Sequence, residues 1–336
     1  MGLMRLIGKR LLLIPISLFI LVSLSFLLLE LMPGNPAITI AGDFASDAEI
    51  EKIEESLGLN DPLGARYLSY LGSVVRGDLG RSFFSDQPVL GELRERLPAT
   101  MELVFLSLIV AAIVGLFLGV LGAYYRGRKV DKATRGTVTL FQSIPDFLMA
   151  LLLIFFLFYL WSVAPAPVGR LGFSGVSVEP ITGFLLVDTL VAGDLNAFVL
   201  AGQHLLLPVL ALGIVYAAYF GKTARSTMAT ALDSTQVEFA RACGLSEWKV
   251  VYYAFLQART PILTYGAILF GALIGGAAII ETIFSWPGAG SWALTAILSL
   301  DIPVIQGFIL AAGFVTITVF LLLDVLILLL DPRVRL

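Results

Sequence analysis

The side chains that could carry chemistry are few and far apart. The chain has one cysteine, Cys243, and one histidine, His204, so it can form no internal disulfide and cannot supply the nitrogen and sulfur ligands of a zinc site. A Ser-His-Asp triad would need His204, and no nucleophile elbow accompanies it. The phosphate-binding pattern GxxxxGK[ST] does not occur in the sequence. We therefore expect a chain that is not an enzyme and holds no metal or cofactor.

Four ionisable residues stand in or beside long apolar runs. Asp146 follows Pro145 inside one run, where a charge is costly, so it is a candidate to line a wet substrate pathway or to pair across a subunit interface. A purely structural pair and a shallower position are the alternatives. Glu281 opens ETIFSWPGAGSW, a segment expected to turn and cap that pathway. Glu102 is expected to stabilise a helix start, and His204 to lie at the membrane interface.

The composition is that of an integral membrane protein. Hydrophobic residues make up 58% of the chain and charged residues 14%, against roughly 25% charged residues in a soluble domain. The mean hydropathy is +0.93. The net charge of −3 gives no indication of a nucleic-acid partner.

Runs of about 20 apolar residues predict six transmembrane helices in an all-α fold. Their approximate ranges are 10–31, 99–124, 137–161, 204–228, 260–284 and 304–330. The first run follows a basic start, as in a signal peptide, but no small-residue cleavage site follows it. We expect a retained first span.

The lysines and arginines predict the orientation. With the N-terminus in the cytoplasm, 15 of the 22 lie in the inner segments and 7 in the outer ones. Short cytoplasmic loops carry such an excess. The sequence therefore predicts a multi-pass protein of the cell membrane with both termini in the cytoplasm.

The outer connector, residues 32–98, is expected to separate an N-terminal span (1–31) from a core of five spans (99–336). SDAEIEKIEESLGL predicts a helix with Ile50, Ile53 and Leu57 on one face that ends at Gly58. A second amphipathic helix is predicted from Leu63 to Val74. Two interpretations stay open: helices lying on the outer membrane surface, or a docking surface for an external partner.

A polar segment, 229–259, separates the fourth and fifth apolar runs. The sequence predicts a helix over 226–243, a left-handed turn at Gly244, and a second helix capped by Ser246. The first helix would place Phe239, Ala242 and Cys243 on one face. A simple connector needs about 2–8 residues, so insertion into a groove of another subunit and a solvated surface helix are both open.

Several motifs resemble one family of transporters. Glu238, Phe239, Ala240 and Gly244 resemble the EAA loop of ABC importer permeases, with Phe239 where a second alanine is usual. The blocks LMPGNPA, RLPATMEL, ETIFSWPGAGSW, DIPVIQGFIL and LLLDPRVR are similar to the B-type subunit of the dipeptide/oligopeptide/nickel permeases. The segment PITGFLLVDTLVAGD is similar to the outer loop of the dipeptide permeases. These blocks run in order along nearly the whole chain.

The resemblance implies a type I importer permease with a division of labour. A C-type permease would complete the membrane pathway, two cytoplasmic ATPase subunits would dock on the permeases, and an extracytoplasmic binding protein would deliver peptides. The ATPase-coupling residues would be Glu238, Phe239, Ala240, Cys243 and Gly244, and the lipid bilayer is the other partner.

Two alternatives to a peptide importer stay open. Within the family, the cargo could be nickel or another small solute. In a different class, the chain could be an autonomous channel or secondary transporter, which would be expected to show an internal repeat or several charges within its spans.

Overall fold

The structure is a computed structural model that describes residues 2–31, 34–42 and 45–330. These residues are mostly helical, and their β-pairing is limited to one bridge between Arg81 and Pro88. Five of their helices are long and apolar enough to cross a membrane, or six if one sharply bent pair is a single span. The predicted all-α membrane fold is therefore confirmed.

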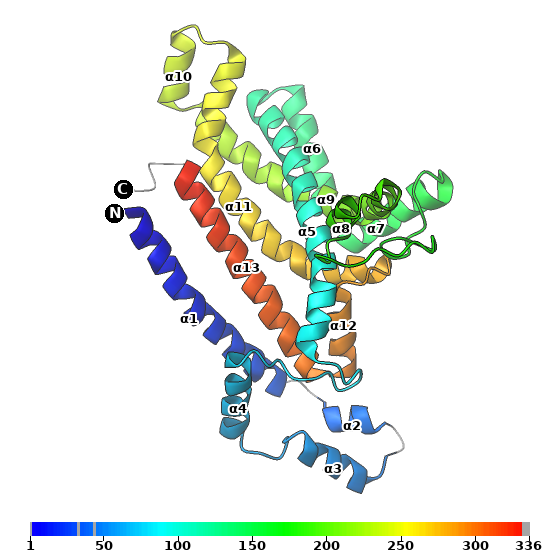
Figure 1. Cartoon of the computed structure of the whole chain (residues 1–336). Coiled ribbons are helices and arrows are strands. Elements are labelled where there is room, and N and C mark those ends of the chain that lie inside the picture. Colours follow the sequence, from blue (N-terminus) through cyan, green and yellow to red (C-terminus); the bar gives the residue numbers. More distant parts are fainter. Residues whose placement is uncertain (1, 32–33, 43–44, 331–336) are drawn as a thin grey trace. The chain divides into compact units, whose positions relative to one another are not determined.

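The chain divides into two compact units: residues 1–98 with 288–318, and residues 99–287 with 319–336. The helices of the first unit are labelled in Figure 1. They are α1 (Gly2–Glu30), α2 (Pro36–Ala41), α3 (Asp47–Ser56), α4 (Leu63–Val75), the first turns of α5 (Val89–Tyr124), α12 (Ala289–Ser299) and the first part of α13 (Ile302–Leu330).

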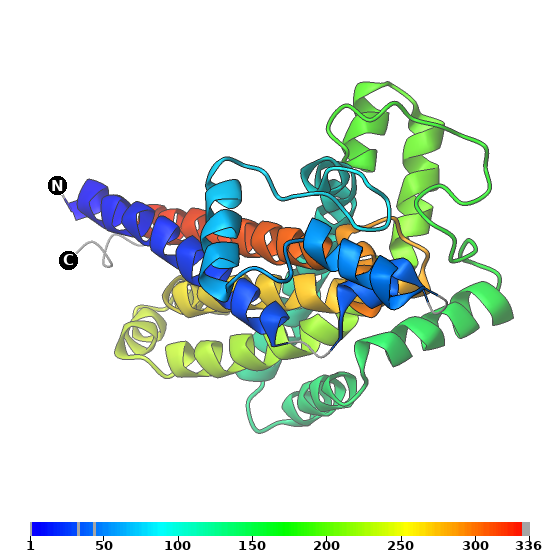
Figure 2. The same cartoon turned by 90° about the horizontal axis from the view of Figure 1, so that it is seen from below.

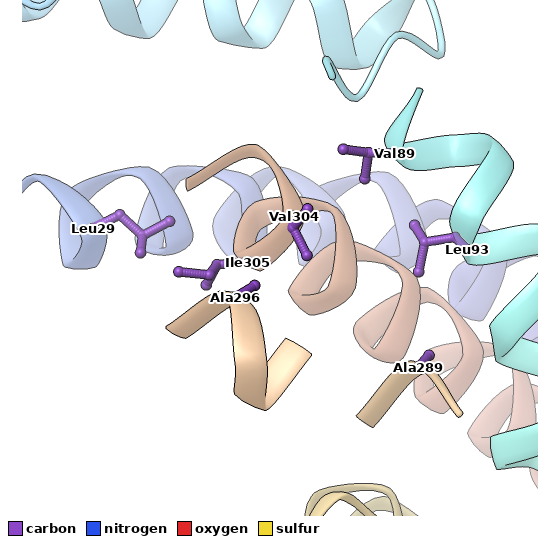
Figure 3. Close-up of a cluster of buried hydrophobic side chains, with 7 residues drawn as sticks. All are labelled: Leu29, Val89, Leu93, Ala289, Ala296, Val304 and Ile305. Atoms are coloured by element: carbon purple, nitrogen blue, oxygen red, sulfur yellow. The ribbon is translucent and has the colours of Figure 1, made fainter. Parts of the chain in front are cut away.

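The core of the first unit explains where α5 begins. Its buried cluster, drawn in Figure 3, consists of Leu29, Val89, Leu93, Ala289, Ala296, Val304 and Ile305. Val89 and Leu93 lie upstream of Pro98, and their burial stabilises helical turns there. The helix that contains the second predicted span, 99–124, therefore begins ten residues before that span, at Val89, and contains Pro98.

Both predicted helices of the outer connector are present. At the start of α3, Glu49 accepts hydrogen bonds from the backbone and hydroxyl of Ser46, both at 2.9 Å, and Gly58 follows the helix with φ +66°. On α4, the ring of Tyr67 lies 5.4 Å from that of Phe26 on α1. The amphipathic face of α4 thus packs against the first apolar helix.

The second unit contains the remaining helices, and Figures 1 and 2 show α9 and α11 side by side. They are the rest of α5, α6 (Lys129–Gln142), α7 (Asp146–Leu153), a π-helix (Ile154–Leu160), α8 (Leu185–Val191), α9 (Leu195–Leu232), α10 (Thr235–Ala242), α11 (Glu247–Ile283) and the last turns of α13.

Glycines let α5 approach α9 closely in this unit. A Cβ atom added at Gly115 would lie 2.8 Å from the Cβ of Phe220, and one added at Gly119 would lie 2.6 Å from the Cβ of Ala224. Small residues at such positions allow the backbones of membrane helices to pack together. The face of α5 that carries Gly115 and Gly119 is therefore the face that packs against α9.

The third predicted span, 137–161, is not one straight helix. α6 and the helix from Asp146 to Leu160 meet at an angle of 99°. Pro145 offers no backbone N–H, and a residue that precedes a proline, here Ile144, avoids the helical conformation. The break falls in the short stretch 142–146, QSIPD, whose polar residues are outweighed by the apolar residues around them. Hydropathy alone therefore predicted a single span.

The fourth helix begins nine residues before its predicted start. Asp194 caps α9 by accepting a hydrogen bond from the N–H of Ala197 at 2.9 Å, so the helix starts at Leu195. His204 consequently lies in the third turn and is buried, with its ring against Gly172. The placement of His204 at the membrane interface stays a prediction.

Candidate functional site

The segment between α9 and α11 forms a short helix followed by a glycine elbow. α10 occupies Thr235–Ala242, and Gly244 adopts φ +73° before α11 begins at Glu247. The N–H of Leu245 donates to the carbonyl of Ala240 at 3.2 Å, which satisfies a carbonyl at the end of α10. Figure 1 shows α10 alongside the first turns of α11. The elbow at Gly244 is confirmed.

Two details of this segment differ from the sequence expectation. The predicted continuous helix 226–243 is interrupted at Asp233 and Ser234, where α9 ends and α10 starts anew. Asp233 accepts a hydrogen bond from Arg126 at 2.6 Å, which ties this break to the turn after α5. Ser246 occupies the cap position of α11 but its side chain makes no capping hydrogen bond.

Of the residues predicted to couple the chain to the ATPase, four are exposed and one is buried. Phe239 is 70% exposed, and Glu238, Cys243 and Gly244 are exposed as well. Ala240 is buried on the inner side of α10.

Sequence reasoning missed a second exposed aromatic residue beside this surface. Trp248, in the first turn of α11, is 76% exposed. Arg241 of α10 reaches across the elbow to Glu247, at 3.5 Å. The sequence shows a tryptophan two residues after the predicted cap, Ser246. The direction in which its side chain points depends on the angle between α10 and α11, which the sequence alone does not give.

Asp146 lies at the break between α6 and α7. It is the first residue of α7, half-buried, and faces α9 and α11. A Cβ added at Gly276 would lie 3.1 Å from its Oδ2 atom and 3.0 Å from the hydroxyl of Tyr216. The carboxylate thus stands close to the hydroxyl of Tyr216 and to the bare backbone of Gly276.

Glu281 occupies a different environment. It lies in the last turns of α11, fully buried, and accepts a hydrogen bond from the hydroxyl of Thr100 at 2.6 Å. The expected loop begins only after Phe284, so the prediction that Glu281 opens it is wrong. Trp286, three residues beyond the end of α11, is buried, and its indole donates to the carbonyl of Ala99 at 3.1 Å.

A buried ion pair fastens the long connector 162–193 to α5. Glu102 accepts from Arg170 at 2.6 Å and from the backbone N–H of Leu186 at 2.8 Å. The guanidinium of Arg170 also donates to the carbonyl of Gly183 and lies 5.9 Å from the ring centre of Trp286. Glu102 on α5 therefore binds two points of the connector, Arg170 and Leu186. The prediction that Glu102 stabilises the start of a helix is wrong, because α5 begins 13 residues earlier, at Val89.

A second carboxylate shapes the same connector. Asp188 is buried and accepts hydrogen bonds from Thr182, through both N–H and hydroxyl, and from the N–H of Gly183. Burial acts to raise the pKa of Asp188, but these hydrogen bonds outweigh it and lower the pKa below its usual value. The turn before α8 is thus built around an ionised carboxylate.

Family models of transport proteins match almost all of the chain. Residues 111–336 match the model described as "Binding-protein-dependent transport system inner membrane component", and residues 3–104 match the model of the N-terminal part of such components. The geometry defines the class of the protein: a helical membrane protein with an elbow at Gly244 between two of its long helices.

Curated relatives agree with these matches over nearly full length. The probable D,D-dipeptide transport system permease protein DdpB of Escherichia coli is 38% identical, over 93% of this chain and 92% of the relative. The di/tripeptide transport system permease protein DppB of Pseudomonas aeruginosa is 37% identical, over 98% of both chains. The dipeptide transport system permease protein DppB of Escherichia coli is 35% identical, over 93% of both.

The chain therefore belongs to the family of binding-protein-dependent transport system inner membrane components, the permease subunits of ABC importers. In this family the ATPase is a separate subunit, so the chain is a transport subunit and not an enzyme. Membership also excludes the autonomous channel or secondary transporter.

A solved structure titled "Crystal structure of an amino acid ABC transporter with histidines" also aligns with the chain. The TM-score is 0.47 and the sequence identity 21%, over 70% of this chain and 93% of that one. The family assignment rests on the sequence matches.

Proposed function

We propose that this chain imports short peptides across the cell membrane as one half of a heterodimeric permease, together with a C-type permease subunit. The supporting observation is the near full-length similarity to three permeases named for dipeptides or di/tripeptides. Nickel or another small solute is the alternative cargo. An extracytoplasmic binding protein would deliver the cargo to the outer segments.

We infer that α10 is the coupling element and that two cytoplasmic ATPase subunits drive transport. The charge bias of the loops supports a cytoplasmic position for α10 and for both termini. Phe239 and Cys243 would enter a groove of the ATPase, with Glu238 beside them. Ala240, which is buried, would hold α10 against its own subunit, and Gly244 would set the angle of the elbow.

Asp146 is proposed to line the substrate pathway. Its carboxylate, at the bend before α7, is half-buried and close to Tyr216 and the backbone of Gly276. A carboxylate in such a place can accept hydrogen bonds from the ammonium group of a peptide. Glu281 is fully buried beside Thr100, so it would meet cargo only after the surrounding helices separate.

Uptake in cells tests the proposed cargo. A strain that lacks this chain is expected to lose the uptake of a labelled dipeptide and to keep its uptake of radioactive nickel, and the intact gene should restore the first. Loss of nickel uptake with normal dipeptide uptake would assign the alternative cargo. No change in either would contradict the proposed function.

A further inference from the structure

A cavity of about 220 Å³ lies between α5, α6 and α9. It is near the end of α9 that leads to α10, since two of its lining residues, Lys222 and Arg225, precede the last residue of α9 by only three turns or less. Its walls are formed by Leu118, Thr134, Arg135, Val138, Thr139, Gln142, Gly221, Lys222 and Arg225.

The lining carries three cations, Arg135, Lys222 and Arg225, and no carboxylate. Asp131 lies behind the wall, where it accepts from Arg225 at 2.7 and 3.0 Å and from the N–H of Gly127 at 2.9 Å. Arg135 approaches the same carboxylate at 3.4 Å. Asp131 is only 1% exposed, and its single charge is shared between Arg225 and Arg135, two of the three lining cations.

Lys222 is the cation that this arrangement leaves unmatched. Within the part of the chain that the structure describes, it forms no ion pair, and it projects from α9 one turn before Arg225. A lysine in a helix apolar enough to span a membrane is costly unless its ammonium group meets water or an anion. The lining of the cavity therefore has a net positive charge, and the ammonium group of Lys222 can donate hydrogen bonds to a bound anion.

We propose that this cavity binds the phosphate group of an anionic phospholipid. Basic pockets between transmembrane helices on the cytoplasmic side suit such headgroups. Thr134, Thr139 and Gln142 add polar groups to the wall, while Leu118 and Val138 make part of it apolar. The exposed side chain of Leu140, next to Thr139 on α6, would contact the acyl chains.

The site would join α6 to α9 close to the proposed coupling element. A lipid phosphate held by Arg135 and Lys222 adds a bridge beside the Asp131–Arg225 pair, which already links the two helices. The bridge needs neither peptide nor ATPase, so it can be tested on the chain alone.

Native mass spectrometry of the purified chain, with lipid added to the detergent, measures this binding. Phosphatidylglycerol is expected to remain bound to the wild-type chain more tightly than phosphatidylcholine. Lys222→Gln and Arg135→Gln should each weaken retention of phosphatidylglycerol about fivefold, the contribution of one basic residue near a lipid surface. Lys132→Gln is the matched control, because Lys132 lies on α6 and is exposed but does not line the cavity.

Three outcomes would overturn the proposal. Equal loss with Lys132→Gln would mean diffuse attraction to the basic surface. Displacement of phosphatidylglycerol by millimolar inorganic phosphate would mean a free-anion site. Equal retention of both lipids would mean that the cations serve another partner, such as an acidic segment of the second permease. None of these results bears on cargo or coupling, so the proposed function stands or falls separately.

Discussion

Glu102→Ala is expected to lower the free energy of unfolding of the chain by about 3 kcal/mol, because removing one member of a buried ion pair leaves the other charge unmatched. The side chains of Glu102 and Arg170 are 5% and 17% exposed. The variant also loses the acceptor for the N–H of Leu186. Thermal unfolding of the purified chain in detergent measures the change.

Trypsin provides a local measurement of the same event. Arg170 is the only basic residue between positions 162 and 193, so tryptic cleavage in this connector can occur only after it. Freed from Glu102, the connector should open more often, and cleavage after Arg170 should accelerate about tenfold or more. The fragments are identified by mass.

Two controls decide whether the pair itself is responsible. Glu95→Ala removes an exposed carboxylate from the same helix and should change neither measurement. The double variant Glu102→Ala/Arg170→Ala should cost less than the sum of the single variants, because it leaves no orphaned charge. Unchanged unfolding and unchanged cleavage in Glu102→Ala would refute the role assigned to the ion pair.

Gly244→Val is expected to reduce transport by the assembled importer without preventing its insertion. A left-handed conformation such as that of Gly244, at φ +73°, costs a non-glycine residue about 1–2 kcal/mol, a factor of about 5–30 in population. A Cβ at Gly244 would meet no atom within 4 Å, so the strain is in the backbone alone. The ratio of peptide import to ATP hydrolysis in proteoliposomes measures the loss.

Gly77→Val is the matched control. Gly77 has φ +77°, and a Cβ there would also meet nothing within 4 Å, but it follows α4 in the outer connector. It should strain the chain by a similar amount and leave the ratio of import to hydrolysis unchanged. If Gly244→Val keeps the wild-type ratio, the elbow does not transmit the work of the ATPase.

Features encoded locally were predictable from the sequence. The apolar runs identified the long helices, since the length of a span follows from the thickness of the bilayer. Gly244 and Gly58 were placed correctly because only glycine adopts a left-handed turn at little cost. Asp194, which caps α9, carried an equally local signal, but the hydropathy window started the helix at residue 204.

Features that depend on distant contacts were not predictable. Glu102 and Arg170 are 68 residues apart, and neither has a neighbour in sequence that indicates the other. The start of α5 at Val89 depends on burial of Val89 and Leu93 among residues near the end of the chain. Trp286 fits the pattern of an interfacial aromatic residue, but it is buried because its indole finds the carbonyl of Ala99.

The most direct test of the central claim, that α10 is the cytoplasmic element on which the ATPase acts, uses the thiol of Cys243. It is the only cysteine of the chain, and it is exposed at the end of α10. In intact cells, a membrane-impermeant maleimide should leave it unlabelled and a permeant maleimide should label it. In the purified importer, bound ATPase subunits should slow the labelling, by an amount that changes with the nucleotide. Labelling by the impermeant reagent from outside would contradict the orientation, and equal labelling rates with and without the ATPase subunits would contradict the coupling role of α10.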